Sequence, residues 1–75
     1  MRSMRWLAIW EAHRAREKYW VVSHYEAMRY RSISETWGLH SHQAAAAYRR
    51  YRIIDEYLAG EVGEAYAAAG LSVTK

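Results

Sequence analysis

The sequence predicts a small all-α domain of about four helices, beginning with a long N-terminal helix. Three observations favour this class. The 75 residues contain no proline, which is the residue that most strongly breaks a helix. Apolar residues recur at three- and four-residue spacing over long stretches, as they do on one face of a helix. The four glycines lie at the ends of these stretches, where helices commonly stop.

The first helix is expected from about residue 3 to residue 30. Helical spacing aligns one apolar stripe along it, made of Trp6, Ile9, Trp10, His13, Trp20, His24, Ala27 and Met28. A charged stretch from Glu11 to Lys18 interrupts the stripe. Because that stretch contains neither glycine nor proline, one continuous helix is favoured over a break near Glu17.

A second, short helix is expected over residues 32–37. Ser32 is followed three residues later by Glu35, which is the capping-box pattern that starts a helix. Gly38 can adopt the left-handed conformation that ends one. Trp37 and Leu39, on either side of this glycine, are expected to be buried at the turn.

A third helix is expected over residues 42–59, with Ser41 as its N-cap. One face of this helix collects Ala44, Ala47, Tyr48, Tyr51, Ile54 and Leu58, and Ile53 lies on the outward face. Gly60 and Gly63 are expected to interrupt the chain before a last helix over residues 61–69. The whole chain, 1–75, is expected to be a single domain.

Charge and aromatic content indicate partners. Residues 1–52 carry ten Arg/Lys against four Asp/Glu, whereas residues 53–75 carry one lysine against four acids. Nine of the eleven basic residues are arginine, which suits phosphate and aromatic partners. The four Trp and seven Tyr exceed what a core of this size can hide. A homodimer is therefore expected, held partly by the first helix or by the segment after Ile53, and the Trp/Tyr surface is also a candidate site for a different protein partner.

Residues 30–50 resemble the helix-turn-helix of bacterial DNA-binding proteins. That pattern places small and apolar residues on two helices around a glycine turn. The matching residues are Ile33, Ser34, Trp37, Gly38, Leu39, Ala44 and Ala47. The match departs from the commonest form at Ser34, where alanine is usual, and at Ala44, where a larger aliphatic residue is usual.

The resemblance implies a central helix-turn-helix at about 32–52 and a small transcriptional regulator that binds duplex DNA. The helix beginning near Ser41 would enter the major groove. Alanines would keep it slim and touch thymine methyl groups, while arginines would hold phosphates or read guanine. The candidate DNA-contacting residues are Ser41, His42, Gln43, Ala45, Ala46, Arg49, Arg50 and Arg52.

The alternative is a small protein–protein interaction module, an inhibitor or adaptor without specific DNA binding. Enrichment in tryptophan and arginine is typical of binding hot spots. Small basic single-domain proteins of this kind are common among phage and mobile-element products. The glycine turn between two capped helices and the arginines that follow it favour the DNA-binding regulator over this alternative.

Other classes are set aside. The chain has no cysteine, no glycine-rich phosphate loop and no nucleophile elbow, so we expect neither an enzyme nor a cofactor. His13 and His24 share a helix face with Glu17 between them, but further ligands at matching spacing are missing, so no metal site is expected. No apolar stretch reaches the roughly 20 residues that span a bilayer, and the expected location is the cytoplasm.

Overall fold

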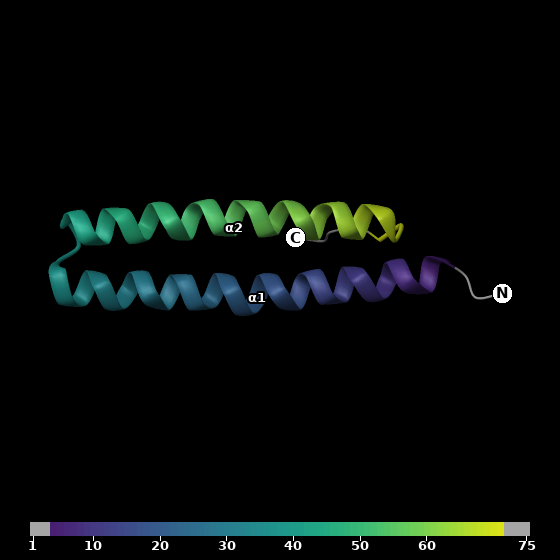
Figure 1. Ribbon diagram of the computed structural model, residues 1–75, viewed down its shortest axis with the longest axis horizontal. Helices are drawn as coiled ribbons and strands as arrows, with labels where there is room; N and C mark the ends of the chain where they lie inside the picture. The colour runs from purple at the N-terminus through teal and green to yellow at the C-terminus, as the bar shows by residue number, and fades with distance from the viewer. Residues whose placement is uncertain (1–3, 72–75) are drawn as a thin grey trace.

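The computed structural model describes residues 4–71, which form an antiparallel helical hairpin (Figure 1). Helix α1 spans Met4–Trp37 and helix α2 spans His42–Ala68. The two helices lie side by side along a rod with extents of 56 × 17 × 14 Å. No strand occurs within the described residues, and the predicted all-α class is confirmed.

The turn between the helices forms at Gly38 and Ser41, the residues predicted to end one helix and to begin the next. Gly38 has a φ of +98°, and its N–H donates to the Ser34 carbonyl at 2.9 Å, which closes α1. Ser41 caps α2, because its Oγ accepts the Ala44 N–H at 3.0 Å. The Ser41 hydroxyl also donates to the Gly38 carbonyl at 2.7 Å, which ties both helix ends together.

The end of α2 is a second glycine cap. Gly70 has a φ of +71°, and its N–H donates to the Ala67 carbonyl. The Leu71 N–H donates to the Tyr66 carbonyl at 2.9 Å. These two bonds form a Schellman motif, so the predicted stop at Gly70 is confirmed.

The expected break before residue 32 is wrong, because α1 continues without interruption to Trp37. Ser32 and Glu35 sit inside the helix and do not start a new one. Just before the expected break, the ring of Tyr30 packs 5.3 Å from that of Tyr48 on α2, and just after it Ile33 is half-buried. Packing on both sides of the expected break therefore favours a continuous helix.

The expected interruption at Gly60 and Gly63 is also wrong, since α2 runs through both glycines to Ala68. Each glycine costs about 1 kcal/mol relative to alanine in a helix. Buried contacts on either side of them, at Leu58 and Ala69, hold the helix in register against α1. The hairpin consequently has two helices where the sequence predicted about four.

The contact between the helices is narrow and made largely of alanine. Its fully buried apolar residues are Ala12, Ala44, Ala47, Leu58 and Ala69. Ala44 and Ala47 therefore point inward as predicted. Trp37 and Leu39 do not, since they are 59% and 63% exposed. The short turn leaves no third helix to cover them.

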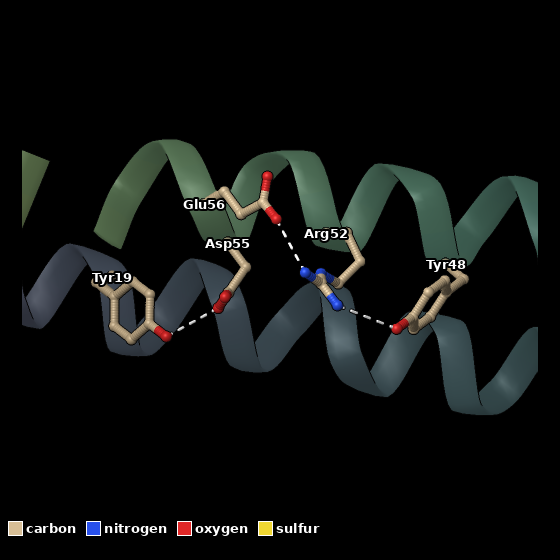
Figure 2. Close-up of polar contacts among 5 residues, drawn as sticks. All are labelled: Tyr19, Tyr48, Arg52, Asp55 and Glu56. Atoms are coloured by element: carbon tan, nitrogen blue, oxygen red, sulfur yellow. Dashed lines mark hydrogen bonds and ion pairs between the residues drawn. The ribbon is translucent and has the colours of Figure 1, made fainter. Parts of the chain in front are cut away.

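Polar contacts complete the seam between the helices. Figure 2 shows the Tyr19 hydroxyl, on α1, donating to Oδ1 of Asp55, on α2, at 2.8 Å. Ser23 Oγ donates to the same oxygen at 2.7 Å. Nearer the turn, Arg50 Nε of α2 donates to Glu26 Oε1 of α1 at 3.0 Å. These side-chain pairs fix the antiparallel register that the alanines alone leave loosely specified.

Candidate interaction surface

The apolar stripe predicted along α1 faces solvent rather than α2. We call it the aromatic stripe and keep the eight residues of the prediction: Trp6, Ile9, Trp10, His13, Trp20, His24, Ala27 and Met28. Trp6 and Trp20 are each 64% exposed, and Trp10 and Met28 are exposed as well. Of the eight, Ile9 and Ala27 alone are half-buried. The spacing was recognised correctly, but the stripe is not the buried face of α1.

The buried face of α1 follows a seven-residue repeat of its own. Ala12 and Glu26 are buried, and Tyr19 between them bonds across to Asp55. His13, Trp20 and Ala27 of the stripe each come one residue after one of these three positions. Successive residues of a helix are rotated by about 100° around its axis, so these side chains point to one side of the contact. The aromatic stripe therefore runs beside the helix contact, along one side of the hairpin.

A hollow lies in the middle of the stripe, lined by Tyr19, Trp20, Ser23, His24 and Ala27 of α1. Two of its three polar residues are already engaged, since Tyr19 and Ser23 both donate to Asp55. The hydrogen bond to Asp55 raises the pKa of the Tyr19 hydroxyl, and burial adds to the rise. Tyr19 thus stays a protonated donor at neutral pH. What the hollow offers a partner is mainly the apolar surface around Trp20.

The candidate DNA-contacting residues lie at the start of α2. His42, Gln43, Ala45, Ala46 and Arg49 are exposed, as predicted for an outward face. Ser41 is half-buried, and its hydroxyl is used by the turn and the helix cap.

Two of the three candidate arginines are engaged in ion pairs. Arg50 binds the buried carboxylate of Glu26, and Arg52 binds Glu56 at 2.9 Å and the Tyr48 hydroxyl at 3.3 Å (Figure 2). Among residues 4–71, no side chain forms a hydrogen bond or ion pair with Arg49. Arg49 is accordingly the candidate with the freest guanidinium.

Residues 32–52 fold as the last turns of α1, the connecting turn and the first half of α2. The helices of a DNA-binding helix-turn-helix meet at about 90–120°. Here the two helices run antiparallel and side by side (Figure 1). The predicted separate helix at 32–37 is therefore wrong. The structure also does not have a short first helix that crosses the helix beginning near Ser41 at a wide angle.

Charge is distributed unevenly along the rod. The part nearest the turn, residues 29–52, holds Arg29, Arg31, Arg49, Arg50 and Arg52 against Glu35, a balance of +4. In the longer remainder, residues 4–28 hold four bases and three acids, and residues 53–71 hold four acids, a balance of −3. We call these two parts the basic end and the acidic end. The hairpin is therefore an electrostatic dipole along its length.

No protein-family model, curated protein or solved structure matches the chain. Within residues 4–71, no three His, Asp or Glu side chains gather as a metal site would require. Neither described helix is long and apolar enough to cross a membrane.

Sequence reasoning missed the polar residues of the seam, namely Tyr19, Ser23, Glu26, Asp55 and the inward role of Arg50. The available signal was spacing, because Glu26 lies seven residues after Tyr19 and fourteen after Ala12. An acid at a position that should be buried calls for a basic partner on the facing helix.

We predict that Arg50→Ala lowers the free energy of unfolding by about 1–3 kcal/mol, because it deprives the buried Glu26 carboxylate of its partner. The Glu26 side chain is only 4% exposed. The matched control is Arg52→Ala, which breaks an exposed ion pair worth about 0.5 kcal/mol or less. Urea unfolding at one protein concentration gives both values. Equal losses in the two variants would contradict the assigned role of Glu26.

Proposed function

We propose that this protein is a small helical interaction module that presents the aromatic stripe of α1 to a protein partner. The observation that carries the proposal is the exposure of Trp6, Trp10 and Trp20 in one line on a continuous helix. Contiguous exposed apolar patches on small proteins mark interaction sites far more often than isolated apolar residues do.

The chemistry of the stripe suits protein recognition. Tryptophan and arginine dominate binding hot spots, because they bury large areas while retaining a polar group. Arg14 lies over the Trp10 ring, 5.0 Å from its centroid, which holds one end of the stripe in a defined arrangement. Because the stripe is carried on a helix, its side chains lose little backbone freedom on binding.

The small core supports the same proposal. Of the five buried apolar residues in the part of the chain that the structure describes, four are alanine and the fifth is Leu58. An alanine contributes little transfer free energy compared with the roughly 1.5–3 kcal/mol of a buried large side chain. A partner that covers the stripe would supply the burial that the hairpin lacks.

We predict that a photoreactive phenylalanine derivative at position 20 crosslinks the full chain to a protein in the cells that produce it. The same derivative at position 57 is the control, because Tyr57 is 66% exposed but lies on α2 away from the stripe. Adducts are read by mass on denaturing gels. Equal crosslinking at the two positions, or none at position 20, would reject the stripe as the interaction site.

Duplex DNA binding is a second candidate function. The observation that favours it is the basic end, where exposed Arg49 lies one to two turns after His42 and Gln43 on the outward face of α2. In this candidate the protein is a small DNA-binding regulator, and α2 would enter the major groove by its first turns.

For the DNA candidate we predict a salt-dependent affinity for duplex DNA. If the five arginines of the basic end contact phosphates, log K falls with log[salt] with a slope of about −4 to −5. Arg49→Ala should reduce that slope by about one unit, whereas Lys18→Ala, at the acidic end, should leave it unchanged. Identical slopes for the two variants, with no sequence enriched from random duplexes, would exclude the regulator.

A further inference from the structure

We infer that the partner of the aromatic stripe is a second copy of this chain, packed antiparallel to form a four-helix bundle. The inference rests on the proposed function, since it uses the same surface. In this assembly, α1 of one copy lies against α1 of the other, and the two turns are at opposite ends. Three observations favour a second copy as the partner and an antiparallel orientation of the two copies.

The first observation is the area left uncovered. The chain exposes 6210 Å². A compact monomer of its mass, 8.8 kDa, exposes about 4,800 Å². The surplus is about 1,400 Å² per chain, so a dimer that removed it would bury about 2,800 Å² in total, which falls in the range of obligate homodimers.

The second observation is the charge along the rod. Side by side in the antiparallel sense, the basic end of each copy, at +4, lies along the far part of the other copy's acidic end rather than along a second basic end. In the parallel sense, two ends of +4 lie together. Because salt screens charges beyond about 10 Å, these local pairings decide the orientation.

The third observation is the pairing of stripe residues with neighbouring charged residues of the partner's α1. A two-fold axis near the middle of α1, between Trp20 and Val21, sets residues equally far from that point against each other. Trp10 then meets the partner's Arg31, and Glu17 meets the partner's His24. The first is a cation–π pair, and the second sets a carboxylate against an imidazole that can donate a hydrogen bond to it.

The mass in solution gives the first test. By light scattering of the full chain at tens of micromolar, we expect twice the monomer mass. Trp20→Glu should give the monomer mass or unfold the chain, and Tyr57→Glu, the equally exposed control, should remain dimeric. A monomeric wild-type chain, or a Trp20→Glu variant that stays a folded dimer, would overturn the inference.

Orientation gives the second test, and it needs no destabilising variant. The chain has no cysteine, so His40→Cys, in the exposed turn, accepts a single spin label. Pulsed dipolar spectroscopy should give a label–label distance close to the 56 Å length of the rod. A label at His24→Cys, in the middle of the stripe, should give a short distance. A His40 distance on the scale of the 17 Å width would show parallel packing and contradict the proposal.

The results separate this inference from the proposed function. A monomer whose position-20 crosslinker captures a heavier protein would reject the second copy but keep the interaction module. A monomer with no crosslink specific to position 20 would reject both.

Discussion

The structure depends on the constraint that two helices can bury only one face of each other. In this hairpin the buried face is narrow, because α2 brings Ala44 and Ala47 against α1 and fills the contact with few large side chains. The tryptophans of α1 are therefore left outside the contact, whereas Tyr19 and Tyr30 take part in it. The exposed tryptophans are a direct consequence of an alanine-lined contact, and a surface of this size on a small chain favours association.

The narrow contact also explains the role of the polar seam. Small side chains provide close approach but little register specificity, because one alanine replaces another when the helices slide. Asp55, which binds both Tyr19 and Ser23, and Glu26, which binds Arg50, are pairs that sliding would break. Buried polar groups of this kind cost more when unpaired than they contribute when paired. They select one antiparallel alignment, and that alignment places the aromatic stripe on one side of the rod.

The sequence predicted the helical class, the stop at Gly38, the cap at Ser41 and the inward alanines of α2. These features depend on local backbone chemistry or on strong periodicity. It failed at Ser32 and at Gly60, where a local signal for a helix end was outweighed by packing against the other helix. Periodicity also identified the aromatic stripe without telling whether it faces a partner helix or solvent, because both arrangements give the same spacing.

The central claim is that the hairpin completes its core by associating through α1. Folding coupled to association makes stability depend on protein concentration. The most direct measurement is thermal unfolding of the full chain, followed by circular dichroism over a hundredfold range of concentration. The account predicts a midpoint that rises steadily with concentration. A midpoint that stays constant over that range, with a cooperative transition, would show that the isolated hairpin is stable alone and would contradict the claim.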